Sequence, residues 1–169
     1  MRYLFILLAV LLSSCAQTYH PVEYQLTDDR IFNFDTTGPV TVLNGQHDIT
    51  AVKIFDDKVT WTSSDAEISE ALSNQLQKEI NKHGHTKGGE EKFLTITVMK
   101  FYTDRSTFVF HTSVDVKVDG GNGFEKMLHI EDGTNGSFGG NIVRSFNGAI
   151  AVAVIHILGD QDVLSYLGS

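Results

Sequence analysis

A single cysteine among 169 residues excludes an intramolecular disulfide and a cysteine-based zinc finger. Basic side chains are also scarce, because 13 Lys and Arg face 21 Asp and Glu and leave a net charge of -8. A broad phosphate-binding surface needs clustered positive charge, so we expect no nucleic-acid partner. The longest unbroken apolar run, residues 4–12, is too short to cross a bilayer, which takes about twenty residues.

Motifs for catalysis are missing as well. No Gly-x-Ser-x-Gly nucleophile motif occurs, and the glycine-rich segment 133–140 is not followed by the Gly-Lys-Ser/Thr of a phosphate-binding loop. Adjacent carboxylates such as Asp56-Asp57 and Glu90-Glu91 fall in turns and loops, where solvation explains them. The sequence therefore predicts a protein that is not an enzyme, with no catalytic, cofactor-binding or metal-ligating residues. A hydrolase that uses a cleft invisible in the sequence is the less favoured alternative.

Five of the seven histidines are candidate ligands or buried groups. The His83-x-His85 pair has metal-ligand spacing, but its place at a helix end beside glycines favours a solvated helix terminus. His111 and His129 lie on candidate neighbouring strands and would face each other across a sheet, as surface residues. His156 lies in an apolar helix and is predicted to be an interior or rim residue.

The first fifteen residues indicate export from the cytoplasm. Arg2 precedes the apolar run 4–12, and small residues follow it, which is typical of a secretory signal peptide. The run Leu12-Ser13-Ser14-Cys15 resembles a bacterial lipobox. That resemblance implies cleavage before Cys15 and attachment of a thioether-linked diacylglycerol and an N-acyl chain to this cysteine. The alternative is an ordinary signal peptide followed by an incidental cysteine.

Residues after the cleavage site bear on the destination of the protein. Ala16 stands where Asp commonly retains enterobacterial lipoproteins in the inner membrane, so its identity resembles the outer-membrane class. Removing residues 1–14 removes Arg2 and no acidic residue, which makes the net charge -9. Because such a surface has little affinity for anionic headgroups, we expect the lipid on Cys15 to hold the protein at the membrane.

Three segments follow from these patterns: a signal peptide over 1–14, a lipidated tether over 15–38 and a single domain over 39–169. The tether has no helical apolar period, although Ile31, Phe32 and Phe34 would be able to dock on the domain.

The domain is expected to alternate strands and helices. Apolar residues recur every four positions over 64–83, and Ser64 with Glu67 has capping-box spacing, which predicts a helix. A second, more apolar and mostly buried helix is expected from Asn141 to about Gly159, followed by a short one over 160–167. Strands are expected at the ranges 39–43, 51–55, 58–61, 93–102, 108–119 and 124–131, whereas 83–92 and 133–140 are expected to be loops. The predicted fold is α+β: a two-layer sandwich with a mostly antiparallel sheet and two main helices on one face.

Aromatic residues gather around one predicted turn. Phe101, Tyr102, Phe108 and Phe110 flank it, and strands favour aromatic side chains in their cores. We expect most of the four to be buried, and any that remain exposed would suggest a partner site.

The pattern as a whole resembles the YajG-like group of small bacterial outer-membrane lipoproteins. The similar features are Cys15, the strand beginning Pro39-Val40-Thr41-Val42, the segment Leu94-Thr95-Ile96-Thr97-Val98 with Phe101-Tyr102-Thr103-Asp104, and the terminal helix. The auxiliary lipoproteins of lipid-transport systems have a similar layered layout. The resemblance brings no catalytic residues to carry over.

The sequence therefore predicts a non-enzymatic, lipid-anchored outer-membrane protein that faces the periplasm and binds or assembles an envelope protein or glycan. The alternative is an accessory carrier that shields a lipid or small apolar ligand beneath its helices. A carrier would need an apolar cavity of a few hundred Å³.

Overall fold

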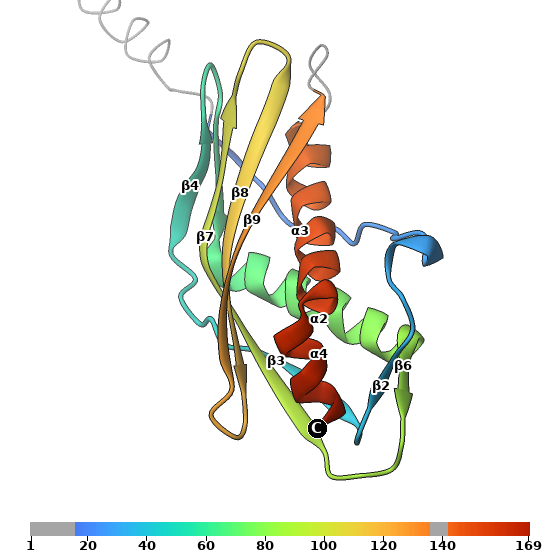
Figure 1. Cartoon of the computed structure of the whole chain (residues 1–169). Coiled ribbons are helices and arrows are strands. Elements are labelled where there is room, and N and C mark those ends of the chain that lie inside the picture. The colour runs from blue at the N-terminus through green and yellow to red at the C-terminus, as the bar shows by residue number, and fades with distance from the viewer. Residues whose placement is uncertain (1–15, 136–141) are drawn as a thin grey trace, which may run out of the picture.

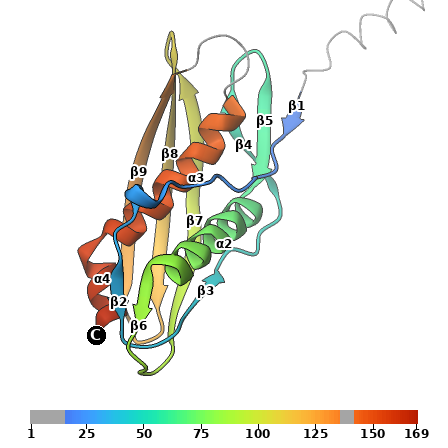
Figure 2. The same cartoon turned by 90° about the vertical axis from the view of Figure 1, so that its right-hand side faces the viewer.

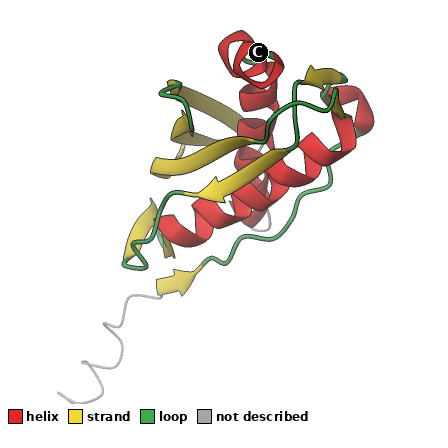
Figure 3. Ribbon diagram, turned by 90° about the horizontal axis from the view of Figure 1, so that it is seen from below, coloured by secondary structure: helices red, strands yellow, loops and turns green. Residues whose placement is uncertain are grey.

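A computed structural model describes residues 16–135 and 142–169, which form a main sheet with helices packed on one face (Figures 1 and 3). The predicted signal peptide, Cys15, the cap Asn141 and residues 136–140 of the glycine-rich segment lie outside the described residues. The α+β sandwich expected from the sequence is confirmed.

The main sheet has the strand order β3 (Val40–Asn44), β7 (Lys92–Arg105), β8 (Val109–Gly120) and β9 (Glu125–Asn135). β7, β8 and β9 form an antiparallel meander, and β3 joins β7 in parallel. The sheet is therefore mostly antiparallel, as the alternating sequence predicted.

Alternation along the strands determines which side chains the sheet buries. Val114, Val116 and Val118 of β8 face the helices and are essentially inaccessible to solvent. A bulge in β7 between Val98 and Lys100 inserts an extra residue, so the inward face continues at Phe101. This bulge breaks the strict period of two that the sequence showed.

The helix α2 (Asp65–His83) lies against this buried face and begins as predicted. Ser64 is its N-cap and accepts a hydrogen bond from the Glu67 backbone N–H at 3.2 Å. The helix buries Ile68, Leu72, Leu76 and Ile80. It ends at Gly84, where a Cβ would come within 2.7 Å of the Ile80 carbonyl oxygen, so the close turn into the next strand requires glycine.

The helix α3 (Ile142–Gly159) packs beside α2, and α4 (Gln161–Gly168) follows it. By length and composition α3 is apolar enough to span a membrane. More than half of it is buried inside the protein, which confirms the prediction of a mostly buried helix and is typical of a core helix. Phe146, in the second turn of α3, contacts the rings of Tyr19, Trp61 and Phe101.

Two smaller sheets complete the fold. The predicted strands β4 (Ala51–Asp56) and β5 (Thr60–Ser64) form a hairpin, and β1 (Ala16–Thr18) adds to β5 in parallel. β2 (Phe34–Thr36) pairs in parallel with β6 (Gly84–Thr86). The sequence reading missed β1, β2 and β6, because a three-residue strand shows no periodicity and its partner is distant in the chain.

The structure corrects several other expectations. The predicted loop 83–92 contains β6, and residues 133–135 of the glycine-rich segment extend β9. The strand expected to begin at residue 108 begins at Val109, so Phe108 lies in the β7–β8 turn and is 67% exposed. Phe101 and Phe110 are buried as expected.

Candidate functional site

The segment expected to be a tether lies along the outer side of the helices. We call residues 19–31 the strap. It leaves β1 beside β5, crosses α3 and reaches the level of β9 before the chain turns toward β2 (Figure 2). A single 3₁₀ turn, η1 (Asp28–Arg30), precedes its last residue, Ile31, which is buried. The folded body thus extends toward the N-terminus beyond the predicted domain start at residue 39.

Tyr19 fixes the beginning of the strap. It is 1% exposed, its ring lies 4.8 Å from the ring of Phe146, and its hydroxyl donates to Asn147 Oδ1 at 2.5 Å. Burial raises the pKa of Tyr19 well above its usual range, so the hydroxyl stays protonated as a donor. The backbone N–H of Val22 donates to the same Asn147 oxygen at 3.2 Å. One buried amide on α3 therefore holds two points of the strap.

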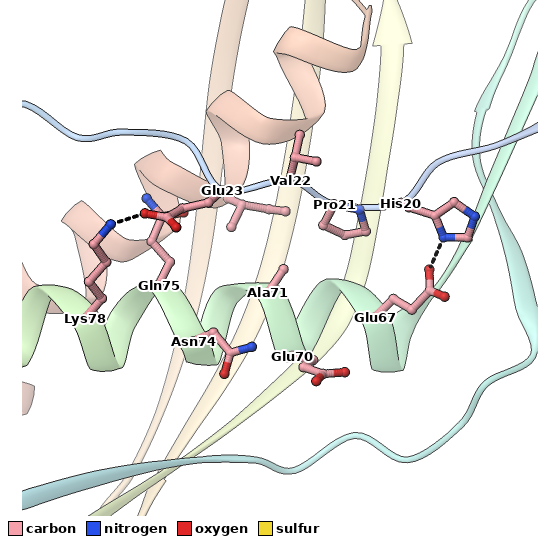
Figure 4. A pocket seen from close by; sticks show the side chains of 11 residues that line it. His20, Pro21, Val22, Glu23, Glu67, Glu70, Ala71, Asn74, Gln75 and Lys78 are labelled. Carbon is pink, nitrogen blue, oxygen red and sulfur yellow. Dashed lines mark hydrogen bonds and ion pairs between the residues drawn. The ribbon is translucent and has the colours of Figure 1, made fainter.

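Contacts to α2 hold the middle of the strap. Gln75 Nε2 donates to the Tyr24 carbonyl oxygen at 2.7 Å, and Gln75 is itself buried. Glu23 forms an ion pair with Lys78, and His20 Nδ1 lies 3.2 Å from Glu67 Oε2 (Figure 4). These exposed pairs contribute little individually, so the buried amide contacts carry most of the attachment.

Two open grooves border the strap. The first, which we call the α2 groove, lies between the strap and α2 and has a volume of about 450 Å³ (Figure 4). Its apolar surface comes from Pro21, Val22, Ala71 and Ile150, and acidic side chains surround it. The pairs Glu23–Lys78 and His20–Glu67 lie along this groove, so most of its charged side chains already have a partner.

The second groove, the α3 groove, lies between the strap, α3 and β9 and has a volume of about 680 Å³. Leu26, Ala151, Val152 and Ile155 give it an apolar floor. Two exposed arginines, Arg30 from the strap and Arg144 from the first turn of α3, also line it.

The charge of the α3 groove differs from that of the chain as a whole. Neither guanidinium has an ion-pair partner among residues 16–135 and 142–169, although the chain has an excess of acidic residues. Asp132 of β9 also lines the groove; its carboxylate accepts from Thr134 Oγ1 at 3.2 Å. The arrangement provides an apolar floor with two unpaired positive charges at its rim and one carboxylate on the β9 side.

The outer face of the sheet carries a separate polar cluster. His129 lies between Asp115, with Nδ1 to Oδ1 at 2.5 Å, and Glu131, with Nε2 to Oε1 at 3.3 Å. The hydrogen bond to Asp115, followed by that to Glu131, raises the pKa of His129 above its ordinary value. All three side chains are at least partly exposed at the protein surface.

The structure agrees with the sequence that His111 and His129 are exposed on neighbouring strands, but it corrects other expectations for the histidines. His83 is buried, with Nε2 3.4 Å from Glu79 Oε2 and Nδ1 3.3 Å from Asn33 Oδ1, so the interpretation as a solvated helix end is wrong for it. His111 pairs with Gly133, and His129 with Asp115, so these two histidines do not face each other. His156 is exposed.

The described residues bring no three His, Cys, Asp or Glu side chains together in a way that would hold a metal ion. Sequence reasoning anticipated that Ile31 could dock on the domain, and Ile31 is buried, but it missed the rest of the strap and both grooves. The apolar residues Tyr19, Val22 and Leu26 were a signal that this segment packs on the body. Because the segment has no periodic pattern, the sequence did not indicate which helix it packs against.

Comparison with known proteins shows the fold. The sequence matches no family model, and no curated protein matches it either. A crystal structure of a Xanthomonas campestris protein, described by the family model DUF330, is similar with a TM-score of 0.56 and 8% identity, over 89% of this chain and 97% of that one.

A second structure, described as a neuraminyllactose-binding hemagglutinin homologue from Helicobacter pylori, has a TM-score of 0.38 and 9% identity, over 86% of this chain and 96% of that one. A TM-score this low does not establish a common fold. The resemblance to YajG-like lipoproteins is not confirmed by these comparisons. They show that the chain shares its fold with a bacterial protein of the DUF330 family model.

Proposed function

We propose that this chain is a bacterial lipoprotein, anchored through Cys15 to the outer membrane and facing the periplasm, that acts without enzymatic activity as a binding or assembly module. The signal-peptide pattern, the lipobox-like Leu12-Ser13-Ser14-Cys15 and the Ala16 that follows it support this address. The likeness to a bacterial DUF330 protein is in keeping with a bacterial source.

The single observation that carries the binding role is the attachment of the strap. The segment next to the proposed anchor is part of the body: Ala16 pairs with Thr60, and Tyr19 is buried against α3. The same segment forms one wall of both grooves. Grooves bounded by an anchored, hydrogen-bonded segment are preformed, which lowers the entropic cost of binding a partner.

Mass spectrometry and membrane partition test the anchor. The mature protein should begin at Cys15 and carry acyl mass, and Cys15→Ser should release the protein to the soluble periplasmic fraction. A mature chain that begins elsewhere, or a Cys15→Ser variant that stays with washed membranes, would contradict the assignment.

Site-specific photocrosslinking in intact cells tests the binding role. A photoreactive residue at Val152, in the α3 groove, should capture a defined envelope partner. The same residue at Met127, which is exposed on the outer face of the sheet, serves as the matched control. Identical capture of abundant periplasmic proteins from both positions would count against a groove that recognises a partner.

The carrier alternative gains support from the α3 groove. An apolar floor beside two guanidinium groups that have no ion-pair partner in the described part of the chain matches an anionic amphiphile, with its chain on Val152 and Ile155 and its headgroup near Arg30 and Arg144. The groove is open, so such a ligand would be only partly shielded from water.

Binding of a long-chain fatty acid or lysophosphatidylglycerol, measured by native mass spectrometry, tests this alternative. Arg30→Gln and Arg144→Gln should each weaken binding about fivefold, since each exposed charge contributes about 1 kcal/mol at most. Lys100→Gln, at an exposed lysine of β7 outside the groove, should leave binding unchanged. Equal loss in all three variants would indicate nonspecific attraction and refute the site.

A further inference from the structure

One end of the molecule gathers the start of β1, the β4–β5 turn and the β7–β8 turn. Figures 1 and 2 show these three features together, whereas the C-terminus, the β6–β7 connection and the β8–β9 turn lie at the opposite end. We call the first group the anchor end. The strands β7, β8 and β9 run from one end to the other, so the molecule is elongated between them.

No linker separates the anchor end from the proposed lipid. Ala16 is the first residue of β1 and pairs with Thr60, and the Tyr19 N–H donates to the Thr62 carbonyl at 2.8 Å. Cys15 is bonded directly to Ala16, and consecutive Cα atoms are only about 3.8 Å apart. A lipid on Cys15 would therefore hold this end of the body at the bilayer, since the chain has no slack to let it move away.

The anchor end has the surface chemistry that a bilayer interface accepts. Phe108 lies in the β7–β8 turn with its side chain 67% exposed. Phenylalanine is among the apolar residues that interfacial segments bury at the boundary between headgroups and acyl chains. The neighbouring β4–β5 turn is tied to the same surface, because Arg105 Nη1 lies 3.3 Å from Asp57 Oδ2.

The two turns at this end differ in charge from the chain as a whole. The two turns and their flanking strand ends carry three basic residues and three acidic ones: Lys53, Lys58, Arg105, Asp56, Asp57 and Asp104. Their charges cancel, whereas the whole chain has a net charge of -8. Two turns without net charge meet an anionic leaflet without the repulsion that a surface with the chain's average charge would experience.

We propose that the anchor end docks on the bilayer, with Phe108 in the interfacial region and the long axis of the molecule directed away from the membrane. This inference rests on the proposed lipidation of Cys15. Docking in this orientation leaves both grooves beside the strap open toward the periplasm, and it points α4 and the C-terminus away from the membrane.

The lone cysteine allows a direct test. In the acylated protein Cys15 is consumed by lipid, so Phe108→Cys introduces one reactive thiol for an environment-sensitive fluorophore. Phe32→Cys is the matched control, because Phe32 is also an exposed phenylalanine, 86% accessible, near η1 and distant in sequence from both turns. Both proteins are reconstituted in vesicles of phosphatidylethanolamine with a minor share of phosphatidylglycerol.

Nitroxide-labelled lipids should quench the fluorophore at residue 108 several-fold more than the one at residue 32. Equal quenching at the two positions in protein of verified acyl mass overturns the docking, while the lipoprotein assignment stands. Protein purified from membranes without acyl mass overturns the proposed function, and the docking with it.

A second variant tests whether the direct connection of Cys15 to β1 sets the orientation of the protein on the bilayer. A long glycine-serine segment inserted between Cys15 and Ala16 should reduce quenching at residue 108 toward the value at residue 32. Unchanged quenching would refute the claim that the direct connection to β1 sets the orientation.

Discussion

The attachment of the strap to α3 leads to a quantitative prediction. Tyr19 is almost fully buried, and its hydroxyl is one of two donors to Asn147 Oδ1. Tyr19→Ala removes the whole ring from its contact with Phe146 and leaves a cavity, which typically costs about 3–5 kcal/mol for a buried aromatic residue. A free tether would predict almost no loss of unfolding free energy.

Two milder variants divide this loss into its parts. Tyr19→Phe keeps the ring and removes one hydrogen bond, so we expect a loss of about 1 kcal/mol. Asn147→Ala leaves both the Tyr19 hydroxyl and the Val22 N–H without their acceptor, and we expect about 1–3 kcal/mol. Tyr19→Ala should cost most because it leaves a cavity beside Phe146, and Asn147→Ala should cost more than Tyr19→Phe because it leaves two donors without an acceptor.

Urea unfolding of the chain that begins at Ala16, followed by circular dichroism, measures these differences. Phe32→Ala is the control, because Phe32 lies just beyond the strap but is exposed, and it should change stability by less than about 0.5 kcal/mol. The double variant Tyr19→Phe/Asn147→Ala should lose less than the sum of the two single losses, because they share one bond. Additive losses, or a Tyr19→Ala variant as stable as Phe32→Ala, would refute the packed strap.

Three further predictions concern the fold and the sheet surface. Ser64→Ala removes the N-cap of α2 and should lower the unfolding free energy by about 1 kcal/mol in the same assay. Ser64→Asp should keep most of the wild-type stability, because Asp is also a good N-cap. Gly120→Ala brings a methyl group to within 2.6 Å of the Tyr166 ring and should lower the melting temperature; an unchanged value would show that the ring moves freely. Asp115→Asn should lower the pKa of His129 in an NMR titration, because it removes the main hydrogen-bonded carboxylate. Because the pKa of His129 is raised in the folded protein, protonated His129 stabilises the fold. This stabilisation is fully present below the pKa of His129 in the unfolded chain and is lost as pH rises through its pKa in the folded protein. A His129 pKa unchanged by Asp115→Asn would contradict this reasoning.

The sequence by itself determined the elements with a clear period. The four-residue spacing of apolar side chains and the Ser64 cap defined α2, and the alternation through β8 defined the buried and open faces of the sheet. These features are local, because each residue's environment follows from its neighbours in the same helix or strand. The Cys15 assignment also rests on a local pattern and stays a prediction for the experiments above.

Only the tertiary structure decided what residues 16–36 do. β1 and β2 are three residues each, and their partners β5 and β6 lie more than 40 positions away, so no local signal identifies the pairing. The acceptor for Tyr19 is Asn147, 128 residues further along the chain. Folding brings distant segments together to form the grooves beside the strap, the pair of arginines at the rim of one groove and the anchor end. No spacing within the sequence records these arrangements.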